Sequence, residues 1–160
     1  MAVAEIIGAA IGVMLLVVVA YMLVGSVLTA AEVVSTAQKD LVLQDEARMR
    51  TAFTISDKAY NPNGNITYKI FNKGTEIISD FKHMDVIIEQ NGEYNIYPYD
   101  ATASNKQGTW YISGRLKDTI HPYQLDPGET FEITVILSDL NPPEWFQMTT
   151  GNGVYASDYI

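Results

Sequence analysis

The chain has 160 residues and no cysteine, and its ten lysines and arginines are outnumbered by 19 aspartates and glutamates, which gives a formal net charge of −9. This length allows one domain beside a long terminal segment. The acidic balance argues against a nucleic-acid-binding protein, because such proteins need a basic surface. The missing cysteine excludes disulfides, thiolate metal sites and cysteine nucleophiles.

An uncharged and mostly apolar run covers residues 6–31, with Glu5 before it and Glu32 after it. About 20 apolar residues are enough to cross the hydrocarbon core of a bilayer. Because the run is apolar on every side, we expect it to be fully buried. Residues 32–50 are instead amphipathic at helical spacing, and the first proline is Pro62. The pattern predicts one helix from residue 2 to about 50, roughly 70 Å long at 1.5 Å per residue.

A cleaved secretory signal is not favoured at this N-terminus. No basic residue precedes the apolar run, which is also longer than the usual core of such a signal. A plain signal anchor has no lysine or arginine on the N-terminal side to orient it, since the first basic residue is Lys39. One explanation is that the numbering starts at a processed N-terminus from which a basic leader has been removed; a plain signal anchor is the alternative.

Several residues of the apolar run are candidates for helix packing. Gly8 and Gly12 form a small-xxx-small pair, which allows the backbones of apolar helices to approach closely, although both could face lipid instead. Val18 and Leu23 are expected to contribute to the same packing between apolar helices. A carboxylate in this environment is costly unless it is paired, so Glu5 is a candidate to pair with an N-terminal ammonium of its own or a neighbouring chain. The alternative for Glu5 is a simple interfacial position.

Beyond the helix the pattern changes from helical to alternating. Turn signals such as PNGN, QNGE, DPGE and GNG separate short segments rich in β-branched and aromatic residues. The predicted strands cover residues 50–60, 65–71, 84–90, 93–99, 109–116, 130–137, 145–150 and 154–160. The expected fold class is α+β, with a long hydrophobic N-terminal helix (1–50) and an antiparallel, immunoglobulin-like β-sandwich head (51–160). Since the helix runs directly into the first strand, we expect the two to be rigidly joined.

The residues give no sign of an enzyme. His83 and His121 are isolated, and no phosphate-binding loop, nucleophile elbow or HExxH motif is present. We therefore predict no catalytic residue, no metal site and no cofactor. Carboxylates between residues 80 and 100 could meet and bind Ca²⁺, with a solvated acidic surface as the alternative. Asn65-Ile66-Thr67 is an N-glycosylation sequon, which is meaningful only if the head lies outside the cell.

The layout resembles the type IV pilin superfamily, in which a long apolar helix precedes a globular head. Glu5 in MAVAEIIGAAIGVMLL stands where bacterial members carry an acidic residue five positions from the processed N-terminus. The head is more similar to the archaellins and their β-sandwich accessory proteins. That similarity lies in KIFNKGTEI (70–78), MDVIIEQNGEY (84–94), LDPGETFEITV (125–135) and TTGNGVYASDY (149–159).

The resemblance implies a structural subunit of an extracellular helical filament, of the archaellum type that serves motility. Such subunits lose a leader to a prepilin-type peptidase, wait in the cytoplasmic membrane, and join many copies of themselves on an assembly platform, with helices in the core and heads outside. Two alternatives remain: a non-motile adhesion pilus, and a membrane-anchored accessory or stator protein that binds the cell-surface layer. An enzyme tethered to the membrane is the least favoured reading.

Overall fold

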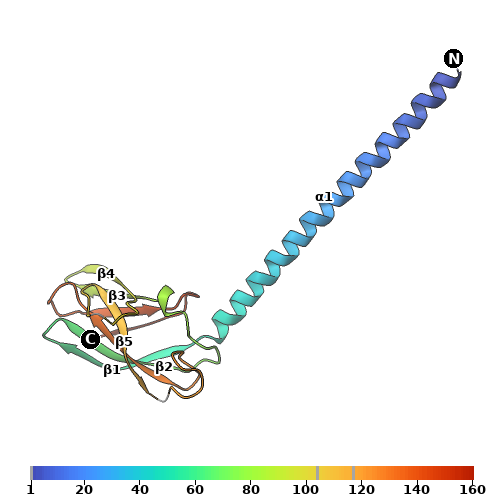
Figure 1. Ribbon diagram of the computed structural model, residues 1–160. Helices are drawn as coiled ribbons and strands as arrows, with labels where there is room; N and C mark the ends of the chain where they lie inside the picture. Colours follow the sequence, from blue (N-terminus) through green and yellow to red (C-terminus); the bar gives the residue numbers. More distant parts are fainter. Residues whose placement is uncertain (1, 104, 117) are drawn as a thin grey trace. The chain divides into compact units, whose positions relative to one another are not determined.

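The computed structural model describes residues 2–103, 105–116 and 118–160. One long helix, α1 (Ala2–Arg50), is followed by eight strands and a short 3₁₀ helix, η1 (Phe81–His83) (Figure 1). The strands are β1 (Phe53–Asn61), β2 (Asn65–Asn72), β3 (Asp85–Gln90), β4 (Glu93–Pro98), β5 (Thr109–Leu116), β6 (Thr130–Ile136), β7 (Trp145–Thr149) and β8 (Tyr155–Tyr159). The chain divides into two compact units, Met1–Gln44 and Asp45–Ile160. The last turns of α1 therefore belong to the head unit.

The helix is the predicted one. No proline interrupts its 49 residues, and leucine, alanine and methionine favour the helical conformation, whereas the valines fill an apolar surface. In this single chain every described side chain from Val3 to Glu46 is exposed. Among the described residues this is the one helix long and apolar enough to cross a membrane. An apolar surface of this extent must be covered by lipid or by other protein.

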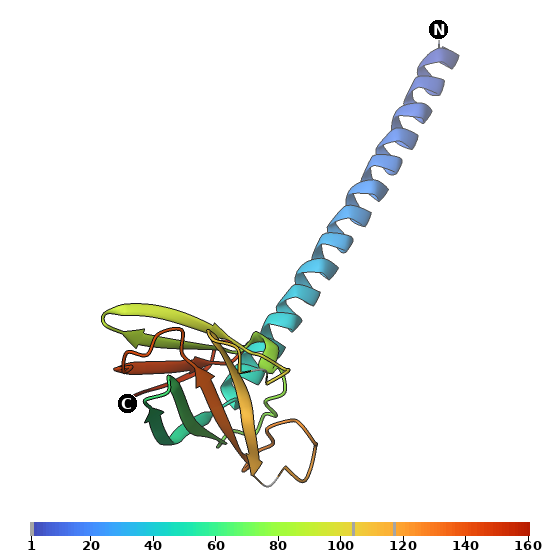
Figure 2. The same ribbon diagram turned by 60° about the vertical axis from the view of Figure 1, so that its left-hand side comes forward.

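The head consists of two antiparallel four-stranded sheets, in the orders β1-β2-β6-β5 and β4-β3-β7-β8 (Figure 2). Neighbouring strands in the sequence pair directly through the hairpins β1–β2, β3–β4, β5–β6 and β7–β8. Two longer connections complete the sheets by pairing β2 with β6 and β3 with β7. The predicted α+β fold with an antiparallel sandwich is confirmed.

The core lies between the inner faces of the two sheets. Each strand contributes alternate residues, as in Ile66, Tyr68 and Ile70 of β2 and Phe131, Ile133 and Val135 of β6. The Tyr68 and Phe146 rings, one from each sheet, lie 4.8 Å apart between centroids. Burial raises the pKa of Tyr68 far above its ordinary value, so its hydroxyl stays protonated and donates to Met148 Sδ at 3.6 Å.

Both lateral edges of the sandwich are partly closed. At one edge β1 approaches β8, where Lys58 Nζ donates to the carbonyl oxygen of Tyr159 at 2.6 Å and pairs with Asp158 at 2.7 Å. At the other edge Tyr99 forms an isolated parallel bridge with Trp110. A lysine placed on an edge strand blocks pairing with a foreign strand.

The end of α1 is fixed to the head by backbone hydrogen bonds. The amides of Thr75 and Glu76 donate to the carbonyl oxygen of Arg50 at 2.9 and 3.2 Å, and those of Lys73 and Gly74 donate to Ala52 at 3.0 and 2.8 Å. These bonds satisfy a carbonyl that a helix end otherwise leaves without a partner.

Gly74 is required by this close approach. A Cβ atom there would collide with the Arg50 carbonyl oxygen and lie 2.6 Å from the Ala52 nitrogen. The fully buried Asn72 side chain secures the same loop, because its amide donates to the carbonyl oxygens of Glu76 (2.8 Å) and Leu125 (2.9 Å) and its oxygen accepts from the Gly74 amide (3.0 Å). These contacts join the last turns of α1 to the head, and the expectation that helix and head form one rigid unit stays a prediction.

Candidate assembly surfaces

The predicted packing residues all lie on the exposed surface of α1. Val18 is 51% exposed and Leu23 is 60% exposed. A Cβ atom added at Gly8 or Gly12 would meet nothing within 4 Å, so both glycines leave open notches in the helix surface. Around the axis of a helix with 3.6 residues per turn, the directions of Gly8, Gly12 and Leu23 lie within about 60° of one another. Val18 points about 80° away from Gly8 in the opposite rotational direction. Contacts made by these residues would therefore come from more than one direction.

Glu5 lies in the first turn of α1 and is exposed. An acidic side chain there interacts favourably with the helix dipole. Within the part of the chain that the structure describes, Glu5 has no ion-pair partner, while Met1 lies outside the described residues. Its pairing with an N-terminal ammonium stays a prediction.

Asn65 stands at the start of β2, directly after the Pro62–Gly64 turn, and is half-buried. It is opposite Asn61 of β1 and Ile136 of β6, on the outer face of the β1-β2-β6-β5 sheet. The sequon asparagine therefore sits at the rim of the sandwich that is remote from the end of α1.

The two histidines lie apart and each contacts one aspartate. His83 Nδ1 is 2.7 Å from Asp80 on the exposed surface, and His121 Nδ1 is 2.8 Å from the buried Asp126. No group of three or more histidines and carboxylates that could hold a metal ion occurs among residues 2–103, 105–116 and 118–160. The carboxylates considered for Ca²⁺ are spread along the sheet, with Asp85 and Glu89 at opposite ends of β3.

The sequence pattern predicts that five aromatic residues on alternating strands belong to the core or to a subunit interface, with an adhesive surface as the alternative: Tyr94, Tyr97, Tyr99, Trp110 and Tyr111. In the structure they divide between core and surface. Tyr97 and Trp110 are completely buried, and the Trp110 indole donates to the Met84 carbonyl oxygen at 3.2 Å. Tyr99 and Tyr111 are partly buried. Tyr94 is 65% exposed on β4.

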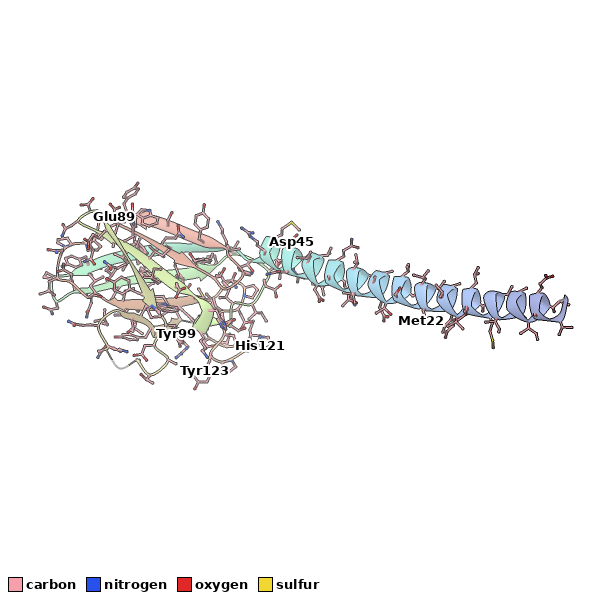
Figure 3. The ribbon with its side chains drawn as sticks, turned by 90° about the horizontal axis from the view of Figure 1, so that it is seen from above. Met22, Asp45, Glu89, Tyr99, His121 and Tyr123 are labelled. Carbon is pink, nitrogen blue, oxygen red and sulfur yellow. The ribbon has the colours of Figure 1, made fainter. Side chains whose placement is uncertain are left out.

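Tyr94 belongs to a larger apolar surface, which we call the aromatic face. It covers the outer side of the β4-β3-β7-β8 sheet, where register places Tyr94, Glu89, Trp145 and Tyr159 in one row across the four strands. Figure 3 shows Glu89 of this row at the end of the head unit opposite to Asp45. The aromatic face consists of Ile87, Tyr94, Ile96, Trp145, Tyr155 and Tyr159. The Tyr94 and Trp145 rings meet edge to face at 6.2 Å between centroids.

A second exposed surface, the β5-end cluster, consists of Ile120 and Tyr123 in the segment after β5 together with Arg115, whereas Leu116, opposite Thr130, points to the outer side of the β1-β2-β6-β5 sheet. The Arg115 guanidinium carbon lies 4.9 Å from the centroid of the Tyr123 ring. Tyr123 has a positive φ of 71°, and its backbone amide donates to Asp118 Oδ2 at 3.0 Å. A non-glycine residue rarely adopts this conformation, so the surrounding contacts hold it in place.

Sequence reasoning did not single out the aromatic face beyond Tyr94, nor Asn72 and Gly74 at the joint. The alternation in β7 and β8 carried a signal for the face, because Phe146 and Met148 alternate with Trp145, and Ala156 alternates with Tyr155. The face to which each set points is decided by pairing between strands distant in sequence. The NKG sequence of residues 72–74 indicates a turn, but nothing in it indicates the contact with the helix end.

The comparisons with known proteins agree with this architecture. In fold the chain resembles the periplasmic archaellum stator protein FlaG from Sulfolobus acidocaldarius, with a TM-score of 0.51 and 20% identity, over 69% of this chain and 99% of that one. A chain of the FlaF–FlaG stator complex from the same organism gives a TM-score of 0.50 and 19% identity, over 68% and 87%. At this identity the likeness shows the fold alone. No curated protein matched the chain at the significance required.

The family model for archaeal-type flagellin matches residues 4–159, which is nearly the whole chain, including the apolar helix. The family match therefore points to an archaellum-related structural protein, and the structural neighbours share the fold. The chain belongs to the archaeal-type flagellin family.

Proposed function

We propose that this protein is the repeating subunit of an extracellular archaellum-like filament that serves motility. The observation that carries the proposal is the helix surface: every described side chain from Val3 to Glu46 is exposed in the single chain, although residues 6–31 carry no charge. Such a surface needs cover from all sides, and a bundle of identical helices provides it. The family match includes this helix, which supports the same role.

The physical route to the filament begins in the membrane. The apolar part of α1 is long enough to hold the subunit in the bilayer before assembly. On assembly, lipid is replaced by neighbouring helices that are equally apolar, and close packing at small residues such as Gly8 and Gly12 favours the exchange. Removal of a leader by a prepilin-type peptidase and extrusion on an assembly platform are part of this proposal. An adhesion pilus would be built in the same way, so the subunit itself does not separate motility from adhesion.

The experiment is negative-stain microscopy of material sheared from cells, with mass spectrometry of the main protein band. Long uniform filaments composed of this chain, with an N-terminus at Met1, would support the proposal. If the chain stays in the membrane fraction and no filament contains it, the filament proposal fails. A swimming assay of a strain lacking the chain then distinguishes a motile from an adhesive filament.

A membrane-anchored stator role is the second candidate, and one observation favours it. The structures of similar fold are named as periplasmic archaellum stator proteins, and the similarity spans 99% of the FlaG chain. In this role α1 would face lipid and the head would bind other archaellum or cell-surface components. Cross-linking between α1 helices of different copies separates the two, because only a filament brings many of them together.

Glycosylation of Asn65 is a further part of the proposed extracellular role. Its position after an exposed turn leaves the rim of the sandwich free for a glycan, although the side chain is half-buried. Intact-mass measurement of the wild type and of Asn65→Gln tests it: a loss of mass beyond the substitution itself identifies a glycan, and equal behaviour excludes one.

A further inference from the structure

The two faces of the sandwich differ in chemistry. On the outer side of the β1-β2-β6-β5 sheet, most positions carry threonine, serine, lysine or glutamate, including the Lys69–Asp57 pair at 2.7 Å. The aromatic face on the other sheet exposes Tyr94, Ile96, Tyr155 and Tyr159 at 62–72%. A half-exposed sheet normally presents polar residues to water, so the aromatic face is the exception.

Its size indicates an interaction surface. Four side chains that are each about two-thirds exposed, at roughly 150–250 Å² apiece, present on the order of 500 Å² of surface. That lies in the range of functional patches on soluble proteins. It falls short of the roughly 800 Å² per partner of a stable independent complex. A surface of this size is suited to one contact among several in an assembly that is held together elsewhere as well.

The charges on the aromatic face argue against pairing with an identical face. Its outward positions include Asp85 and Glu89 but no lysine or arginine. Two such faces packed together would bring carboxylates of the same sign into contact, which costs free energy. The partner surface should be apolar and should carry a positive charge.

The β5-end cluster has this character on the same chain. Ile120 and Tyr123 are 63% and 70% exposed, and Arg115, which lies over the Tyr123 ring, has no ion pair with any residue from the described ranges. The cluster follows the edge strand of one sheet, whereas the aromatic face covers the other sheet. One head can therefore present both surfaces to different neighbours.

We propose that the aromatic face of one copy docks on the β5-end cluster of a neighbouring copy. This contact is heterologous, and repeated heterologous contacts form rings or open helical polymers rather than closed dimers. The inference rests on the proposed function, since a filament supplies the neighbouring copies. Tyr94, Trp145 and Tyr159 bury apolar surface in the contact, and the Arg115 guanidinium lies against an aromatic ring or Glu89.

The experiment uses engineered cysteines in the full-length chain, which has none of its own. The chain carrying Ile96→Cys and Ile120→Cys is expressed as the sole copy, and cells are treated with a short bis-maleimide. The matched control combines Ile96→Cys with Ser56→Cys, which is exposed on the polar sheet. We expect a ladder of covalent oligomers from the first pair and little product from the control. Equal yields from the two pairs would overturn the proposed contact.

A charge exchange provides an independent measurement. Glu89→Arg or Arg115→Glu alone should lower the cross-linking yield about threefold, as expected for one partly exposed ion pair, and the double variant should recover most of it. A double variant that is weaker than either single one contradicts the contact. Tryptophan fluorescence verifies that each variant is folded.

Microscopy of the same cells keeps the two proposals separate. Filaments without the specific ladder would leave the filament proposal standing and refute the contact. A specific ladder in membranes without filaments would refute the filament and retain the contact. An aromatic face that stays open to cysteine labelling in assembled filaments also refutes the contact, and would leave that face free for a glycan or another protein.

Discussion

The buried Asn72 side chain provides the most direct test of how the head is fixed to the end of the helix. It is completely buried and makes three hydrogen bonds, two as a donor to the carbonyl oxygens of Glu76 and Leu125 and one as an acceptor from the Gly74 amide. The substitution Asn72→Ala removes all three bonds. It leaves two carbonyls and one amide with one partner fewer in the interior.

The structure gives the expected magnitude. Each intramolecular hydrogen bond contributes a net 0.5–1.5 kcal/mol, so three lost bonds lower the free energy of unfolding by about 3 kcal/mol. For a domain of this size, that corresponds to a fall in melting temperature of about 10 °C. Asn72→Asp should be at least as harmful, because it retains the bond from the Gly74 amide but places a carboxylate against two carbonyl oxygens.

Thermal unfolding of the detergent-solubilised full-length chain measures the effect. The two tryptophans, Trp110 and Trp145, both lie in the head, so their fluorescence reports head unfolding without a contribution from α1. Asn95→Ala is the matched control, because Asn95 is exposed on the edge strand β4. If Asn72→Ala and Asn95→Ala lower the melting temperature equally, the assigned role of Asn72 is wrong.

The remaining predictions concern the helix and one edge of the sandwich. Val18→Asp places a charge in the centre of the apolar run, where it costs about 3 kcal/mol per helix; we expect microscopy to show no filaments while the head remains folded. Glu5→Ala should slow assembly in a time course if the carboxylate pairs with a neighbouring N-terminus, and an unchanged rate would assign it a simple interfacial position. Lys58 hydrogen-bonds Asp158 and thereby lowers the pKa of that carboxyl below its ordinary value. The folded form therefore gains stability above the ordinary pKa of an aspartate and loses it as the pH falls through the lowered value. Lys58→Ala should reduce this acid-dependent part of the melting temperature, although the hydrogen bond from the Tyr159 amide to Asp158 remains, and an unchanged pH profile would contradict the pairing.

The sequence predicted the elements of this fold well because their signals are local. The helix ends at Arg50 as expected, and the strand Thr109–Leu116 agrees at both ends. The other strands differ from the prediction by one to three residues at one or both ends, as at β1, which begins at Phe53 instead of residue 50. Thr51 and Ala52 connect the helix to the sheet and are not part of the strand. The carbonyl oxygen of Ala52 accepts hydrogen bonds from the amides of Lys73 and Gly74.

The surfaces were harder to predict because they depend on which strands become neighbours. Tyr94 and Trp145 are 51 positions apart in sequence, and they meet because β3 lies between β4 and β7. The sequence pattern indicates that the aromatic residues on these strands belong to the core or to a subunit interface. Tyr97 and Trp110 do lie in the core, and the interface role of Tyr94 stays a prediction. Similarly, Arg115 and Tyr123 meet through a positive φ that no local pattern required.

The exposed helix and the aromatic face also fit into one energetic argument about assembly. Moving α1 from lipid into a bundle of like helices exchanges one apolar environment for another, so the hydrophobic effect contributes little to that step. Van der Waals packing at Gly8 and Gly12 supplies part of the free energy, and contacts between heads in water must supply the rest. There the aromatic face does gain from the hydrophobic effect, at roughly 25 cal/mol per Å², which for a surface on the order of 500 Å² is about 12 kcal/mol before the costs of association. The apolar helix therefore keeps the subunit either in the membrane or in the filament core with little preference, and the contact between heads shifts the equilibrium toward the filament. Weakening the face by Tyr94→Ser should therefore raise the membrane-bound fraction at the expense of filaments, whereas Ser56→Ala on the polar sheet should not change it; equal fractions for both variants would refute this division of roles.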